Sequence, residues 1–167
     1  ASAMVIDASG QVIYSKDIDT VRPIASITKL MTAMVVLDSG LDLDEIITVS
    51  RDDRDLVQQT GSRLGFGACL SRREMIMLAI MSSENRAATA LGRNFPGGTE
   101  AFVAAMNNKA VKLGMSKSHF SDPAGLHVEN QSTARDLASM VKAAEAYPLI
   151  REASTTTHLE VHPFPGH

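Results

Sequence analysis

The pattern of apolar and polar positions divides the chain into a β-prone beginning and a long helix-rich middle. Residues 3–7 and 12–15 are β-prone runs on either side of a polar turn, which is typical of a hairpin. From residue 25 to residue 38, apolar side chains recur around most of a helix that Gly40 is placed to end. We therefore expect this helix to be central and buried, and a short strand is predicted at 46–49.

The stretch that follows is predicted to contain a charged loop and two helices. Residues 51–55 form a dense charge cluster, which we interpret as a solvated loop. Ser71 and Glu74 form a capping box before an apolar helix that runs to residue 81. Helical composition resumes at 86–92 after a polar break.

Two more helices are predicted before the end of the chain. Thr99 is expected to cap the first of them. Thr133 and Asp136 open the second, which should end near residue 146, before Pro148. Residues 155–161 allow one further strand. The expected fold class is therefore α+β, with an N-terminal hairpin and a helix-rich region.

Composition and charge are those of a single globular domain spanning residues 1–167. The hydrophobic content of 44% and the charged content of 21% exclude a disordered chain. The net charge of -3 lacks the basic footprint of nucleic-acid-binding proteins. We find neither a transmembrane segment nor a signal peptide. A mature exported protein would also lack its signal peptide, so this absence does not argue against export. Cys69 is the only cysteine, so no internal disulfide is expected.

Lys29 is the first residue with candidate chemistry, because it lies inside the apolar helix predicted at 25–38. Lysines are rarely buried without a partner, and Ser26 lies one helical turn earlier on the same face. Ser26 also follows Pro23 in the first turn, where free backbone N–H groups and the positive end of the helix dipole gather. Burial and this dipole both lower a lysine pKa, so a neutral amine could take the proton of Ser26. The backbone N–H of Ser26 could donate to a developing oxyanion. The alternative is that Lys29 reaches solvent and Ser26 only caps the helix.

A second serine-lysine pair shows how little the spacing alone decides. Ser139 and Lys142 have the same separation as Ser26 and Lys29. Ser139, however, lies in the middle of a predicted helix, where its hydroxyl would bond to the preceding turn, and Lys142 lies at the polar end. We expect this second pair to be structural.

The polar break at residues 82–85 brings a second group of functional side chains to a junction between two helices. On its own, Ser83-Glu84-Asn85 is an ordinary helix cap. Beside a serine-lysine pair, the hydroxyl of Ser83 offers a proton relay and the carboxamide of Asn85 offers a contact to a substrate amide.

Three segments, in this order, resemble the low-molecular-mass penicillin-binding proteins. Residues 22–33 (RPIASITKLMTA) look like the SxxK segment of this family, and residues 81–88 (MSSENRAA) are similar to its SxN segment. Residues 121–126 (SDPAGL) and 132–137 (STARDL) match a further stretch typical of D-alanyl-D-alanine peptidases. The first two segments are closest to the D-alanyl-D-alanine endopeptidase type.

The resemblance implies a serine peptidase with the serine β-lactamase-like fold, exported to the periplasm and acting on peptidoglycan peptides. It implies that Ser26 attacks the penultimate D-alanine carbonyl, with Lys29 as the general base. Ser83 would relay protons to the leaving amine, and Asn85 would hold the substrate backbone. Water would then release the acyl group, whereas β-lactam antibiotics would acylate the same serine and leave slowly.

The family's third motif, Lys-Thr-Gly or a close variant, does not occur among the 167 residues. In the family it lies on a later strand that binds the substrate carboxylate. We therefore expect the C-terminal strands of the family sheet to be absent from this chain and turnover by the chain alone to be impaired. Two alternatives stay open: a penicillin- or peptidoglycan-binding module without turnover, and a β-lactamase. A class A β-lactamase would need a deacylating glutamate in a Glu-x-x-Leu-Asn stretch, which does not occur here.

The remaining candidates point to no metal site or cofactor. His158 and His162 have a spacing seen in metal sites, but no cysteine or carboxylate cluster completes one. We interpret this segment as a plain loop and predict neither a metal nor a cofactor.

Overall fold

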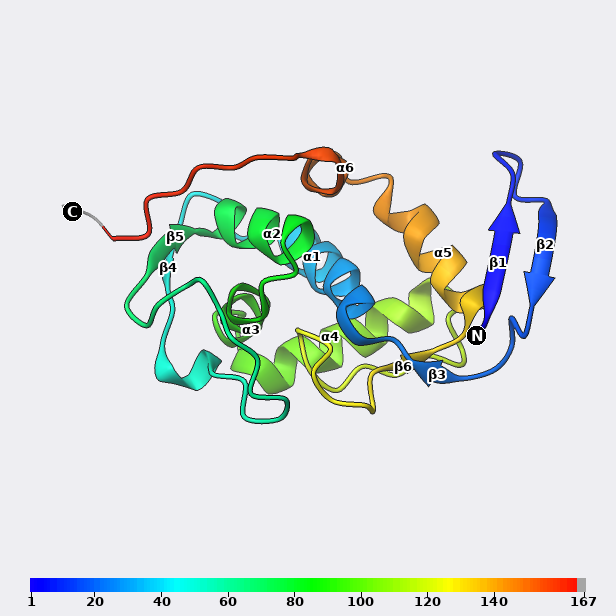
Figure 1. Ribbon diagram of the computed structural model, residues 1–167, viewed down its shortest axis with the longest axis horizontal. Coiled ribbons are helices and arrows are strands. Elements are labelled where there is room, and N and C mark those ends of the chain that lie inside the picture. Colours follow the sequence, from blue (N-terminus) through cyan, green and yellow to red (C-terminus); the bar gives the residue numbers. More distant parts are fainter. Residues whose placement is uncertain (165–167) are drawn as a thin grey trace.

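The computed structural model describes residues 1–164, in which one central helix is surrounded by five others (Figure 1). The central helix is α1 (Thr28–Asp38). It packs against α2 (Arg72–Met81), α3 (Asn85–Arg93), α4 (Gly98–Lys112), α5 (Ala134–Ala144) and α6 (Pro148–Thr155). Within residues 1–164, no helix combines the length and apolar character needed to cross a membrane.

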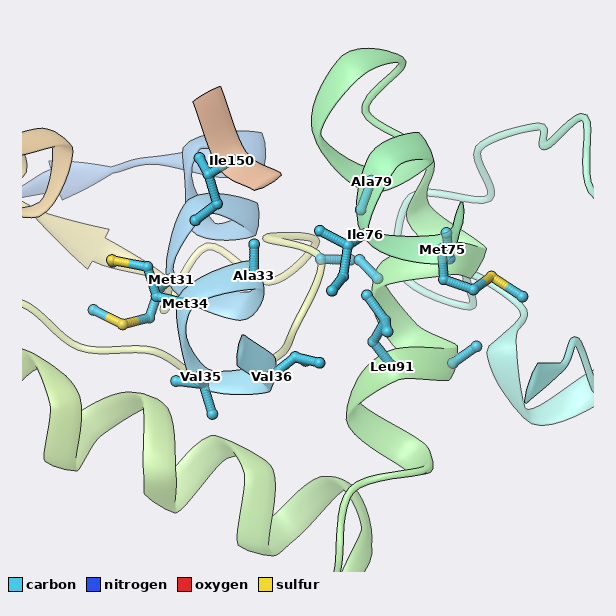
Figure 2. Packing of buried hydrophobic residues seen from close by; sticks show 14 of the residues in the cluster. Met31, Ala33, Met34, Val35, Val36, Met75, Ile76, Ala79, Leu91 and Ile150 are labelled. Atoms are coloured by element: carbon cyan, nitrogen blue, oxygen red, sulfur yellow. The ribbon is translucent and has the colours of Figure 1, made fainter. Parts of the chain in front are cut away.

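Helix α1 is buried on nearly all sides, as its sequence predicted. Figure 2 shows its Ala33 and Val36 facing Ile76 of α2 and Leu91 of α3, and all four side chains are at most 2% exposed. Burying one large aliphatic side chain stabilises a fold by about 1.5–3 kcal/mol, so α1 anchors the core. One residue of the predicted apolar stripe, Ile27, is instead 44% exposed because it precedes the helix.

The strands of the described residues form three separate antiparallel pairs. They are β1 (Ala3–Ile6) with β2 (Val12–Lys16), β3 (Arg22–Pro23) with β6 (Gln131–Ser132), and β4 (Ile46–Thr48) with β5 (Cys69–Ser71). The first pair is the predicted hairpin, and it lies beside α5 at the opposite end of the molecule from β4 and β5 (Figure 1). Strands β3, β5 and β6 were not predicted, and β3 and β6, with two residues each, are too short to show an alternating pattern.

The charge cluster at residues 51–55 is the expected solvated loop only in part, since three of its five residues are exposed and two are buried. It begins with a 3-10 turn (Arg51–Asp53), and Asp53 and Asp55 are only 1% and 5% exposed. Arg93 of α3 donates two hydrogen bonds to the carboxylate of Asp53, at 2.9 and 2.8 Å. Buried charges persist where they are paired and hydrogen-bonded, and that condition is met here.

Two further predictions, the Thr99 cap and the strand at 155–161, were wrong, and helix α6 was not predicted. Helix α4 begins at Gly98 and has no side-chain cap from Thr99. Helix α5 ends at Ala144, within two residues of its predicted end, and Pro148 begins α6, because proline suits the first helical position. The strand expected at 155–161 is therefore absent, since α6 takes up its first residue and the others have no regular structure.

Candidate active site

Ser26 lies on a tight turn directly before the central helix. Sequence analysis placed it in the first turn of an α-helix, but Ala25–Ile27 form a 3-10 turn that leads into α1. Ala25 has a φ of 46°, a left-handed conformation that costs free energy in a residue with a Cβ. The side chain of Ser26 is exposed at the surface. The chain therefore presents this hydroxyl to solvent on a strained turn.

Lys29 is buried and is hydrogen-bonded to Ser26. It is 2% exposed, and its Nζ donates to Ser26 Oγ at 3.1 Å and to the backbone oxygen of Ala124 at 2.8 Å. Burial lowers the pKa of Lys29 to about 8, although the carboxylates of Asp122 and Glu84 act in the opposite direction. The alternative that Lys29 reaches solvent is therefore wrong. An amine with a near-neutral pKa in contact with a serine hydroxyl is able to activate that hydroxyl.

The carbonyl that holds Lys29 belongs to a loop organised by Asp122. The carboxylate of this residue accepts hydrogen bonds of 2.5–3.2 Å from the backbone N–H groups of Ala124, Gly125, Leu126 and His127 and from Nδ2 of Asn130. Thr32 of α1 donates to the backbone oxygen of Pro123 at 2.6 Å. The Lys29–Ala124 hydrogen bond therefore joins a helix and a loop that are both held in place, so the position of Lys29 depends on the loop as well as on its own helix.

Gly125 allows this loop to approach the turn that carries Ser26. Its φ is 79°, and a Cβ added there would lie 1.9 Å from the backbone oxygen of Ala25. No side chain fits at that distance, so close packing of the loop on the turn requires glycine.

Ser83 and Asn85 lie in the break between α2 and α3, where sequence analysis placed them. Ser83 is exposed with a φ of 54°, and Asn85 is the first residue of α3. Both line a surface pocket of about 370 Å³, together with Gly61, Ser62, Arg63, Ser82 and Glu84. The charge of Glu84 acts on the pKa of Lys29, which brings this break within electrostatic range of the lysine. Within residues 1–164, no hydrogen bond joins Ser83 or Asn85 to Ser26 or Lys29.

Sequence reasoning missed the groups that support these residues. Asp122 and Asn130 were not singled out, although an aspartate at the start of a turn is a known signal for side-chain bonds to the following backbone. Asp55 was assigned to solvent, and Thr60, which accepts a hydrogen bond of 2.9 Å from Asn85 Nδ2, was not singled out.

Comparison with known sequences assigns the chain to a family. A sequence profile of D-alanyl-D-alanine carboxypeptidases, the S11 peptidases, matches residues 1–163. The D-alanyl-D-alanine endopeptidase of Pseudomonas aeruginosa is 52% identical over 156 residues, and that of Escherichia coli is 51% identical over 156 residues. Each alignment covers 93% of this chain and 50% of the relative, so the chain spans half the length of these curated relatives.

Solved structures show the same fold. The Streptomyces K15 DD-transpeptidase superposes with a TM-score of 0.83 at 29% identity, covering 91% of this chain and 62% of that one. A D-alanyl-D-alanine carboxypeptidase from Mycobacterium tuberculosis gives a TM-score of 0.81 at 31% identity, covering 93% and 59%. The α+β fold class and the resemblance to penicillin-binding proteins are thereby confirmed. By its sequence as well as by its fold, this chain belongs to the D-alanyl-D-alanine carboxypeptidase family of serine peptidases.

Proposed function

We propose that Ser26 is the nucleophile of a serine-type D-alanyl-D-alanine peptidase that cleaves peptidoglycan peptides in the periplasm. One observation carries the proposal: a lysine that is 2% exposed, with a pKa lowered to about 8 by burial, lies 3.1 Å from the Ser26 hydroxyl. Endopeptidase activity is favoured over carboxypeptidase activity, because the relatives at 52% and 51% identity are named endopeptidases.

Acylation follows from the two partners of Lys29. A neutral amine has two N–H donors and one lone pair. If one N–H stays on the backbone oxygen of Ala124, the lone pair can accept the Ser26 proton. The hydrogen bond between these groups then reverses, and Ser26 Oγ attacks the carbonyl carbon of the penultimate D-alanine. In this proposal the backbone N–H of Ser26 donates to the developing oxyanion.

The second half of the reaction uses the break between α2 and α3. In this proposal Ser83 passes the proton from Lys29 to the leaving amine, and Asn85 holds the substrate backbone. Water then hydrolyses the Ser26 ester. A β-lactam would acylate the same oxygen, and its amine would remain attached to the acyl group, so it cannot diffuse away. All of these substrate roles rest on the family's motifs.

A penicillin-binding module without turnover is the second candidate, because labelling by penicillin needs only acylation of Ser26, whereas peptide cleavage also needs release of the acyl group. The test is to incubate the chain with penicillin and follow its intact mass, and separately to offer it a cross-linked D-alanyl-D-alanine peptide. Stable labelling with peptide cleavage supports the peptidase. Stable labelling without cleavage supports the module, rapid loss of the label with penicillin hydrolysis supports a β-lactamase, and no labelling at all contradicts the proposal.

A further inference from the structure

Asp55 closes the segment 55–60 into a compact loop beside the pocket. It is 5% exposed although it lies in a stretch of mostly exposed residues. One carboxylate oxygen accepts from the backbone N–H groups of Val57 and Gln58, at 2.9 and 2.8 Å. The other accepts from the N–H and the hydroxyl of Thr60, at 2.9 and 2.7 Å. Four donors thus converge on a single carboxylate.

These bonds determine the direction of the next hydrogen bond. Burial acts to raise the pKa of Asp55, but the bonds from Thr60, Gln58 and Val57 outweigh it and lower the pKa to about 2. The carboxylate is therefore ionised at neutral pH and can only accept. The Thr60 proton must then point at Asp55, and Thr60 Oγ1 is left to accept from the Nδ2 of Asn85, at 2.9 Å.

The direction of the hydrogen bonds from Asn85 to Thr60 and from Thr60 to Asp55 sets the orientation of the Asn85 carboxamide. An asparagine side chain can rotate by a half turn and exchange its donor and acceptor ends. With Nδ2 held by Thr60, one N–H of the Asn85 amide and its Oδ1 have no hydrogen-bond partner among residues 1–164. One donor and one acceptor are complementary to the carbonyl and the N–H of a peptide group.

We propose that Asp55, acting through Thr60, orients the Asn85 carboxamide for a peptide group of the substrate, which makes Asp55 and Thr60 positioning residues of this site. The inference rests on the proposed function for the identity of the substrate. The hydrogen-bonded chain itself does not depend on that function.

A second contact ties the same segment to the lysine. Gln58 Nε2 donates to the backbone oxygen of Leu126 at 2.7 Å, and Leu126 belongs to the Asp122 loop whose Ala124 carbonyl holds Lys29. The segment 55–60 therefore connects the Asn85 carboxamide with the loop that covers the lysine. If Asp55 and Thr60 had a purely structural role, substituting either residue would lower the stability of the fold, and the effect on acylation would not depend on the presence of Asn85.

The test is a double-mutant cycle on the rate of Ser26 acylation by penicillin. Thr60→Val keeps the shape of the side chain but removes the hydroxyl, and should slow acylation about tenfold, whereas Thr60→Ser should stay within about threefold of the wild type. In an Asn85→Ala background, Thr60→Val should have no further effect. Thr157→Val, at an exposed threonine outside the site, is the control and should change nothing. Equal slowing by Thr60→Val in both backgrounds, or no slowing in either, would overturn the inference.

A spectroscopic readout separates this inference from the proposed function. In ¹H–¹⁵N spectra, the side-chain amide signals of Asn85 should shift in Thr60→Val and in Asp55→Asn, but little in Thr60→Ser. This readout needs no reaction at Ser26, so a chain that penicillin does not label refutes the proposed function alone. Unchanged Asn85 signals in Thr60→Val, with the melting temperature preserved, refute the orientation of the carboxamide.

Discussion

Two serine-lysine pairs with identical spacing occur in this chain, and their surroundings are opposite. Lys29 is 2% exposed and touches Ser26 at 3.1 Å, whereas Ser139 and Lys142 are both exposed on α5. Lys29 is the second residue of α1, where the helix dipole disfavours an ammonium, and Lys142 lies in the last turn of α5, where the dipole favours one. Spacing brings a hydroxyl and an amine together, but burial and the position along the helix decide whether the amine can act as a base.

What covers the amine is the second difference between the pairs. The Asp122 loop lies over the first pair and supplies the Ala124 carbonyl. The outer face of α5, by contrast, borders an open groove of about 660 Å³ that Lys142 lines beside the hairpin. The Asp122 loop therefore covers the amine of the first pair, whereas the amine of the second pair faces an open groove.

The largest expected effect is at the two serines. Ser26→Ala should abolish covalent labelling by penicillin, because it removes the hydroxyl that contacts the buried amine of Lys29, while the melting temperature stays close to that of the wild type. Intact mass after incubation measures the labelling. Ser139→Ala is the matched control and should label at the wild-type rate. Persistent labelling of Ser26→Ala would show that another group is the nucleophile.

The two lysines give the next largest effect. Lys29→Arg keeps a positive charge but cannot release a proton near neutral pH, so acylation should slow by about 10²–10⁴-fold. Lys142→Arg should leave the rate unchanged, since its charge lies in solvent at a helix C-terminus. Stopped-flow or quenched labelling with a fluorescent penicillin measures both rates. A near-normal rate in Lys29→Arg would assign the proton to a different base.

The loop over Lys29 can be tested at its closest contact. Gly125→Ala would place a Cβ 1.9 Å from the Ala25 oxygen and should destabilise the fold by about 3 kcal/mol or more, because the loop must move away. Gly40→Ala is the control: its φ is 66°, but nothing lies within 4 Å of the new Cβ, so only the left-handed backbone costs about 1–2 kcal/mol. Urea denaturation measures the two losses. Equal losses would mean that the loop does not press on the Ser26 turn.

Sequence reasoning succeeded where a signal is local. The apolar residues around the helix predicted at 25–38 indicated the burial of α1, and the capping box at Ser71 predicted the start of α2. The polar residues Ser83-Glu84-Asn85 predicted the break between α2 and α3. It failed where a structure depends on partners far along the chain. From its sequence neighbours Asp53 is predicted to be a solvated charge, because its partner Arg93 lies 40 residues later in the chain.

The supporting residues of the site were hidden for the same reason. Thr60 and Asn85 are 25 residues apart, and Lys29 and Ala124 are 95 residues apart. Neither hydrogen bond leaves a periodic pattern in the sequence. The direct site residues were accessible because the family's motifs carry them, whereas the backbone carbonyl that holds Lys29 has no side-chain identity to detect.

The smallest expected effect is the pH dependence of acylation, and it tests the cause of the difference between the two lysines. A general base must be deprotonated, so with a pKa of about 8 for Lys29 the rate should rise through pH 8 and level off above it. About a tenth of the amine is neutral at pH 7 and about nine tenths at pH 9, which predicts a rise of about tenfold. Glu84→Gln removes a carboxylate that raises the pKa of Lys29, so the midpoint should move to lower pH.

Glu145→Gln, which lies near Lys142 on the groove beside the hairpin, is the control and should leave the midpoint in place. Rates of penicillin labelling between pH 6 and pH 10, with the fold checked by circular dichroism at each pH, provide the measurement. A flat profile between pH 7 and pH 9 would mean that Lys29 is already neutral or is not the base. A midpoint that moves upward in Glu84→Gln would contradict the assigned influence of Glu84 on Lys29, because removing a nearby negative charge should favour the neutral form of the amine.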